Sequence, residues 1–249
     1  MVSNKILIFL LIVYVLIYSI EPMSVSACDL HDSTSLGTHG FTCLQLDSDT
    51  TFQDNEIRHT ILSCLPQSYV MLDYSYRING CSLSTFHRDV TSSKSSLKTQ
   101  YPTFTAIWYQ YDGDMVSLCK YSNNNLKPFT FSRPTNIHGE KNTIVIFDCD
   151  ILHAGMLNSV GMNRQVIQFK MAHRDDLQKV SHLQNLHVSK RTSCENEMNL
   201  SHRFQRYMSY MFSGSIEYVF KPLMIKKYDN GTLYGQLQNT IPIMFYNNA

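Results

Sequence analysis

Residues 144–155 read Ile-Val-Ile-Phe-Asp-Cys-Asp-Ile-Leu-His-Ala-Gly, which is an apolar strand, a polar turn and a short apolar segment that delivers a histidine. The β-branched and aromatic residues from Ile144 to Phe147 are typical of a buried strand. Ala154 and Gly155 are small, so they leave space around the imidazole of His153. A lone histidine in such a place is usually a hydrogen-bonded core residue, and it indicates a site only if other ligands join it.

Short segments of the same texture lie on both sides of this strand. They are rich in aromatic and β-branched residues, and turn residues separate them, among them Asn79-Gly80, which suits a tight hairpin. No helical periodicity occurs between them, which favours an antiparallel sandwich or barrel over alternating α/β structure. The predicted strands cover residues 68–78, 82–86, 104–111, 115–119, 143–147 and 165–172.

Both ends of the chain differ from this β region. An unbroken apolar run from Ile6 to Ile20 predicts an N-terminal hydrophobic helix, either a cleaved signal peptide or a single-pass membrane anchor. The stretch from Cys28 to about Asn55 is rich in Ser, Thr, Asp and Gly, which is typical of a linker or a loosely packed arm. Residues 195–212 have the spacing of an amphipathic helix that covers one face of the β core.

Length, charge and cysteine content limit the function. A chain of 249 residues, 43% of them hydrophobic, can bury one sizeable core. Lys and Arg number 21 against 20 Asp and Glu, so no basic field is available to hold a phosphate backbone, and no nucleic acid partner is expected. The seven cysteines form no close Cys-x-x-Cys pair, which argues against a structural zinc site, and their odd number leaves at least one unpaired.

The residues that carry chemistry are concentrated in the β region. His87 and Asp89 lie two residues apart, and in an extended segment such residues point to the same face, so both can reach one ion. With His153 they complete two histidines and one carboxylate, the facial ligand set of non-haem Fe(II) oxygenases. Arg164, 11 residues after His153, opens an apolar strand, and its planar guanidinium can hold a carboxylate through two hydrogen bonds.

This order of motifs resembles that of a known family. From about Leu72 to Arg174 the chain is similar to the core of Fe(II)/2-oxoglutarate-dependent dioxygenases, in particular the phytanoyl-CoA hydroxylase-like branch and uncharacterised members encoded by large DNA viruses. The resemblance implies that His87, Asp89 and His153 are the Fe(II) ligands. It also implies that an arginine, here Arg164, pairs with the distal carboxylate of the co-substrate 2-oxoglutarate.

The resemblance further implies a fold, a reaction and additional contacts. The fold is mainly β, a double-stranded β-helix (jelly-roll or cupin-like) core with flanking helices. The reaction is hydroxylation of an unidentified substrate by O2, with release of succinate and CO2, and ascorbate is a candidate reductant. Family members place polar or aromatic side chains of central strands against the co-substrate, and the candidates by location are Thr105, Trp108 and Tyr109.

The predicted organisation has four parts: a signal peptide or anchor (1–27), a linker or N-terminal arm (28–63), the oxygenase core (64–176) and a C-terminal extension that packs on the core (177–249). We therefore expect a protein that is membrane-associated or in the secretory pathway. Three alternatives stay open. The chain is a catalytically inactive membrane-tethered binding module of the same fold, a cupin-like metalloprotein with another metal, or a structural or adhesion protein.

Overall fold

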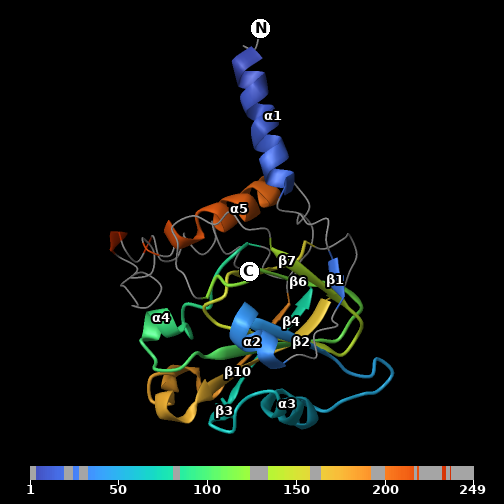
Figure 1. Ribbon diagram of the computed structural model, residues 1–249, viewed down its shortest axis with the longest axis vertical. Coiled ribbons are helices and arrows are strands. Elements are labelled where there is room, and N and C mark those ends of the chain that lie inside the picture. Colours follow the sequence, from blue (N-terminus) through green and yellow to red (C-terminus); the bar gives the residue numbers. More distant parts are fainter. Residues whose placement is uncertain are drawn as a thin grey trace.

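Two β-sheets face each other between helices in the computed structural model (Figure 1), which describes residues 4–19, 25–27, 33–80, 85–123, 134–157, 164–191, 200–215, 218, 232–233 and 236. The large sheet has seven strands, and most of its pairings are antiparallel. Its order is β11 (Leu186–Arg191), β4 (Tyr74–Gly80), β10 (Arg164–His173), β5 (Phe104–Tyr109), β8 (Thr143–Asp148) and β2 (Phe41–Gln45), with β3 (Tyr69–Met71) also paired to β10.

The small sheet has four strands, and an isolated bridge adds His87 to its β9 edge. Its order is β1 (Val25–Ala27), β7 (Thr135–Gly139), β6 (Gly113–Leu118) and β9 (His153–Gly155). The chain passes back and forth between the sheets. Strands β4, β5, β8 and β10 belong to the large sheet, and the segments between them belong to the small sheet, namely His87, then β6 and β7, then β9. Segments far apart in sequence therefore enclose one interior.

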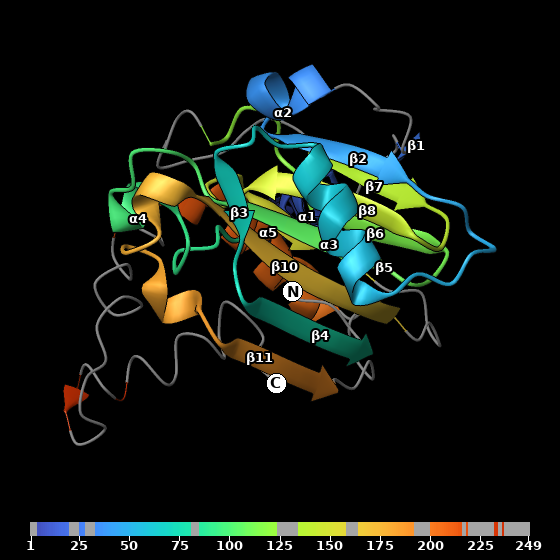
Figure 2. The same ribbon diagram turned by 90° about the horizontal axis from the view of Figure 1, so that it is seen from below.

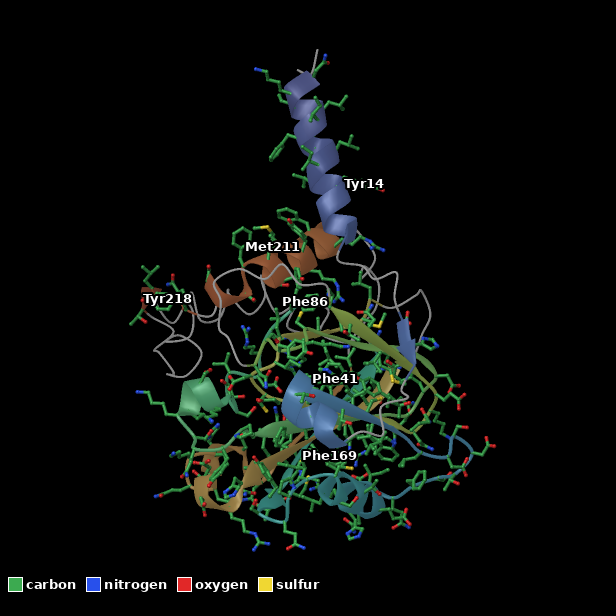
Figure 3. The ribbon with its side chains drawn as sticks, in the orientation of Figure 1. Tyr14, Phe41, Phe86, Phe169, Met211 and Tyr218 are labelled. Atoms are coloured by element: carbon green, nitrogen blue, oxygen red, sulfur yellow. The ribbon has the colours of Figure 1, made fainter. Side chains whose placement is uncertain are left out.

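Successive side chains of a strand point to opposite faces of its sheet, so one face of each sheet lines this interior. Neighbouring strands are in register there, so that Lys170, Thr105, Phe147 and Phe41 form one row across the large sheet. An apolar cluster fills much of the interior, and one of its members, Phe41, is labelled in Figure 3. Its buried members are Phe41, Cys43, Tyr109, Met115, Val116, Leu118, Ile137, Val145, Phe147, Ile151 and Val166.

Helices cover the outer faces of both sheets. Helix α3 (Asp54–Ser63) lies against the large sheet (Figure 2) and inserts Ile57 and Ile61 among its outer side chains, including Phe169, which is labelled in Figure 3. Helix α5 (Leu200–Met211) lies over the small sheet and packs Tyr210 against Phe86. Short helices α2 (Ser33–His39) and α4 (Lys94–Leu97), and the 3₁₀ turns Arg174–Asp176 and Ser181–Leu183, complete the described elements.

The structure differs from the sequence expectations at two strands. Asn79-Gly80 is not a hairpin turn, because both residues are paired within β4, opposite Gln165 and Arg164 of β10. Strand β2 lies within the segment expected to be a linker or arm, where it pairs with β8 and buries Phe41 and Cys43. Only five residues long and surrounded by polar residues, β2 leaves no sustained period in the sequence.

Helix α1 (Asn4–Ser19) contacts α5, projects away from the sheets (Figure 1), and exposes apolar side chains from Ile6 to Ile12. Among the described residues, no helix combines the length and the apolar character needed to span a membrane.

Cys43 is disulfide-bonded, whereas Cys64, Cys119 and Cys149 are free thiols, so none of these three is its partner.

Asn142 joins the large sheet to the loop before α3, and its replacement tests this part of the fold. Its buried side chain donates to the carbonyl oxygens of Asp47 and Thr50, both at 2.8 Å, and accepts from Trp108 Nε1 at 3.2 Å. Its φ of 68° lies in the left-handed region. We expect N142A to lower the free energy of unfolding by about 3 kcal/mol, measured by guanidinium unfolding, because the buried Trp108 Nε1 loses its acceptor and two partly buried hydrogen bonds are also lost.

A matched variant separates backbone strain from hydrogen bonding. Asn185 has a similar φ of 58° but is exposed, so N185A should cost only about 1 kcal/mol. Equal losses in the two variants would contradict the role given to the Asn142 side chain.

Candidate metal centre

A backbone bridge brings the two histidines together. His87 and His153 exchange both N–H···O bonds at 2.9 Å, so they are directly opposite each other in an antiparallel pair. Side chains at such positions lie on the same face, and the two imidazole centroids are 4.4 Å apart. Phe147 of β8 packs beside the His153 ring at 4.5 Å between centroids and fixes its position from the large sheet.

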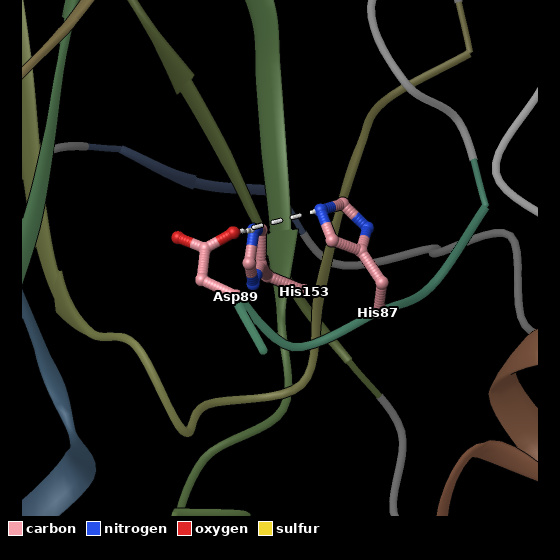
Figure 4. A group of neighbouring side chains, drawn as sticks. All are labelled: His87, Asp89 and His153. Carbon is pink, nitrogen blue, oxygen red and sulfur yellow. Dashed lines mark ion pairs between the residues drawn. The ribbon is translucent and has the colours of Figure 1, made fainter. Parts of the chain in front are cut away.

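Asp89 joins this pair because it lies two residues beyond His87 in an extended segment. Its backbone N–H donates to the carbonyl of Cys149 at 3.0 Å, which ties the segment to the turn after β8. Arg88, between the two ligands, points away, and its buried Nε donates to the carbonyl of Asp150 at 2.7 Å. Ligand atoms of His87, Asp89 and His153 all lie within 4.8 Å of one another (Figure 4).

The orientation of both imidazoles suits metal binding. Nδ1 of His87 lies 2.9 Å from the carbonyl of Thr85, and Nδ1 of His153 lies 3.0 Å from that of Ile151. A carbonyl only accepts, so each Nδ1 carries the hydrogen and each Nε2 presents a lone pair, the arrangement usual for metal-ligating histidines. Both Nε2 atoms face Asp89 Oδ1, at 3.8 and 3.7 Å. These separations are too long for hydrogen bonds but allow both atoms to bind one ion at about 2.1 Å.

The other carboxylate oxygen of Asp89 is held by the large sheet. Oδ2 accepts from Lys170 Nζ at 2.6 Å and from Thr105 Oγ1 at 2.7 Å. Lys170 and Thr105 are register partners on neighbouring strands, and the lysine also donates to the threonine at 2.7 Å. The two oxygens of Asp89 therefore have separate partners, the sheet for Oδ2 and the imidazoles for Oδ1.

Burial and charge set the protonation of these groups. Burial lowers the pKa of both histidines, and that of His153 falls to about 3, which keeps both rings neutral near pH 7. Burial alone would raise the pKa of Asp89, but Lys170 and the two histidines outweigh it and hold that pKa well below its usual value. Likewise, Asp89 outweighs the effect of burial on Lys170 and raises the lysine pKa.

The remaining predicted residues are found at different places. Arg164 and Lys170 share the inner face of β10, six residues or about 20 Å apart. Arg164 is buried, donates to the carbonyl of Asp114 at 3.1 Å and lies 5.9 Å from the Tyr111 ring centroid. Tyr109 is at this same end, because it is the register partner of Val166, two residues after Arg164. Burial raises the pKa of Tyr109, and the nearby Arg164 acts to lower it.

Thr105 and Trp108 differ in the face they use. Thr105 is on the inner face, and its hydroxyl is hydrogen-bonded to Asp89, so it contacts a candidate metal ligand directly. Trp108 has the opposite parity on β5 and packs in the outer cluster with Ile144 and Phe169, beneath α3. The structure therefore does not bring Trp108 to the triad.

Lys170 and Arg206 lie at the site although the sequence did not single them out. Lys170 is six residues from Arg164 and therefore on the same face of β10. The sequence feature that could have indicated a role for it is a lysine within an apolar strand. Arg206 of α5 is fully buried, donates to Gly155 O and to Ser117 Oγ, both at 2.8 Å, and stacks over Phe86 at 4.7 Å. No local pattern in the sequence links a helical arginine to strands this distant.

Helix α5 thus holds both ligand-bearing segments from the outside of the small sheet. Arg206 contacts Gly155, two residues after His153, and Phe86, the residue before His87. The backbone N–H of Phe86 also donates to Ser209 Oγ at 2.8 Å. The C-terminal helix therefore positions the histidines although it carries none of the ligands.

Comparison with known proteins gives distant structural similarities. HygX from Streptomyces hygroscopicus, solved with nickel and 2-oxoglutarate bound, is 10% identical over 57% of this chain and 85% of HygX, with a TM-score of 0.42. The non-haem alpha ketoglutarate dependent epimerase SnoN from nogalamycin biosynthesis is 9% identical over 57% of this chain and 79% of SnoN, with a TM-score of 0.38.

A third solved structure, EvdMO1, is 11% identical over 49% of this chain, with a TM-score of 0.37. The match covers 31% of EvdMO1, so this chain spans about a third of that protein. No family model and no curated protein matches the sequence.

Replacing Arg206 tests the role of α5. We expect R206M to lower the free energy of unfolding by about 2–4 kcal/mol, because two hydrogen bonds from a charged donor are lost and the buried Ser117 hydroxyl and partly buried Gly155 carbonyl remain. R206K keeps the positive charge but not the planar guanidinium with its two donor groups, so it should lower the free energy of unfolding by about half as much. Guanidinium unfolding measures both, and an R206M protein as stable as the wild type would show that α5 does not hold these strands.

Proposed function

We propose that this protein is a non-haem Fe(II)- and 2-oxoglutarate-dependent oxygenase that hydroxylates an as yet unidentified substrate. The observation that carries the proposal is the convergence of His87, Asp89 and His153, with both Nε2 lone pairs and Asp89 Oδ1 facing one point. Two histidines and one carboxylate on one side of an ion leave its other positions open, which is the arrangement used by this class of oxygenase. When bound there, Fe(II) would supply O2 activation, with 2-oxoglutarate as the electron donor.

The chain's own residues would bind and orient the co-substrate. Arg164 is a buried cation on the inner face of β10, the face that also carries Lys170, and its planar guanidinium suits the distal carboxylate of 2-oxoglutarate. Tyr109, at the same end, is the predicted residue best placed to help position it. Thr105 acts on Asp89 instead, since its hydroxyl hydrogen goes to Oδ2. The apolar cluster between the sheets would exclude water from this interior.

The fold proposal is finer than the description of two sheets. We propose that β4 to β10 form a double-stranded β-helix, because the chain alternates between the sheets in this segment except at the consecutive strands β6 and β7. Residues 64–176 then make up the core, and β2 and β11 extend the large sheet at its two edges. Placement in the phytanoyl-CoA hydroxylase-like branch rests on the order of the sequence motifs.

The reaction class can be tested with the purified full chain, prepared anaerobically. With Fe(II), ascorbate and 2-oxoglutarate we expect succinate formation that H87A and D89A abolish, because each variant removes one of three ligands. Succinate is quantified by mass spectrometry, and Mn(II) binding is measured by calorimetry. Tight binding of zinc or manganese without succinate would favour the cupin-like metalloprotein, and absence of metal binding would favour the binding module.

A second variant tests the co-substrate anchor separately from the metal. R164M should weaken 2-oxoglutarate binding to the Mn(II)-loaded protein by about 30- to 1000-fold, equivalent to about 2–4 kcal/mol, because a pair of charge-assisted hydrogen bonds is lost. Mn(II) affinity should stay unchanged. If R164M bound 2-oxoglutarate as tightly as the wild type does, the anchor would lie elsewhere.

We also propose that residues 1–27 direct the chain to a membrane or the secretory pathway. Two observations support this: the exposed apolar side chains of α1, and the disulfide of Cys43, since disulfides persist in oxidising compartments. Tagged full-length chain should fractionate with membranes or enter the lumen, whereas a chain lacking residues 1–27 should stay in the cytosol with Cys43 reduced. Cytosolic full-length protein would contradict the proposal.

A further inference from the structure

Lys170 is a buried ammonium whose donors are all used within the protein. Its side chain is 3% exposed, and it donates to Asp89 Oδ2 at 2.6 Å, Thr105 Oγ1 at 2.7 Å and Ser92 Oγ at 2.9 Å. An ammonium has three donors and no acceptor, so these three bonds complete it. Lys170 is therefore not placed to bind a co-substrate or substrate, and its charge is directed at Asp89.

The charges of the described site cancel without any ion. Each imidazole has its hydrogen on Nδ1, which donates to a backbone carbonyl, and a lone pair on Nε2, so the rings add no charge. Asp89 contributes one negative charge and Lys170 one positive charge, in contact through Oδ2 at 2.6 Å. A divalent cation at Oδ1 and the two Nε2 atoms would lie on the other side of the same carboxylate. It would be attracted by Asp89 but repelled by the fixed ammonium, and in a buried site this repulsion is only weakly screened.

We propose that Lys170 is a built-in counter-ion of Asp89 that keeps the triad assembled without metal and limits the affinity of the site for divalent cations. The inference rests on the proposed metal site and adds a property to it. Because Lys170 and Thr105 both donate to Oδ2, Asp89 would offer an ion its other oxygen, Oδ1. Lys170 is thus a positioning residue, since it acts through Asp89.

Neutralising Lys170 separates this role from simple structural support. In K170M the carboxylate of Asp89 stays buried without its counter-ion, so the metal-free protein should unfold at a lower temperature. A divalent cation would then restore the missing positive charge. We expect K170M to bind Mn(II) at least about tenfold more tightly than the wild type, and its thermal shift on saturation with Mn(II) to be larger.

The experiment uses calorimetry and thermal unfolding of the full chain with Mn(II) as the only added ligand. K170R, which keeps the charge, should bind Mn(II) within about threefold of wild type. K179M removes the partly exposed lysine that pairs with Asp176 and should also leave Mn(II) affinity unchanged. If K170M does not fold, K170Q provides a neutral side chain that retains a hydrogen-bond donor at this position.

Each outcome decides the question. A folded neutral variant that binds Mn(II) no more tightly than wild type would overturn the counter-ion role, even if its metal-free form were less stable. Absence of Mn(II) binding in the wild type together with binding in K170M, abolished by H87A in the same background, would support it strongly. Absence of binding in wild type and variant alike would overturn the metal site itself, and the counter-ion role with it.

Discussion

The backbone bridge between His87 and His153 is the constraint on which the site depends. It joins a segment that follows β4 to one that precedes β10, and it sets two imidazoles side by side with their centroids 4.4 Å apart. Because the bridge lies at the edge of the small sheet, the chain must pass between the sheets several times before it can form. The site is therefore a product of the topology and not of either segment alone.

The interior contains two chemically different ends joined by one strand. Strand β10 carries Lys170 beside Asp89 at one end and Arg164 at the other, with Val166 and Gln168 between them on the same face. All three donors of Lys170 are used by Asp89, Ser92 and Thr105. Arg164 lies at the end of β10 that is farther from the triad. One strand thus supplies two cations, and because they are an even number of residues apart they lie on the same face.

Much of the site was predictable because it depends on spacing within single strands. The two-residue separation of His87 and Asp89 places both on one face, and the location of His153 at the end of an apolar segment points it inward. Register between strands is not written in any local pattern, so the pairing of Lys170 with Thr105, which directs the lysine to Asp89, could not be derived. The same limit applies to Trp108, since β5 is apolar on both faces and its sequence does not reveal which one is the interior.

The fold was predictable where strands were long and less so where they were short or edge-bound. The aromatic and β-branched texture located β5, β8 and β10, whereas three-residue β9 and the polar β11 carry little signal. Asn79-Gly80 is a dipeptide that favours a turn. Asn79 nevertheless pairs with β10 on one side and with β11 on the other, and these strand pairings override the local preference.

The contact of α5 with both histidine-bearing segments has a consequence for biosynthesis. Ribosomes release the chain from its N-terminus, so all three candidate ligands emerge before Arg206 and Ser209 do. Until those residues are made, Phe86 and Gly155 lack the helix that holds them from outside. The nascent chain therefore carries all three candidate ligands before α5 can hold their segments in place, so the assembled triad belongs to the finished polypeptide and not to the one still being translated.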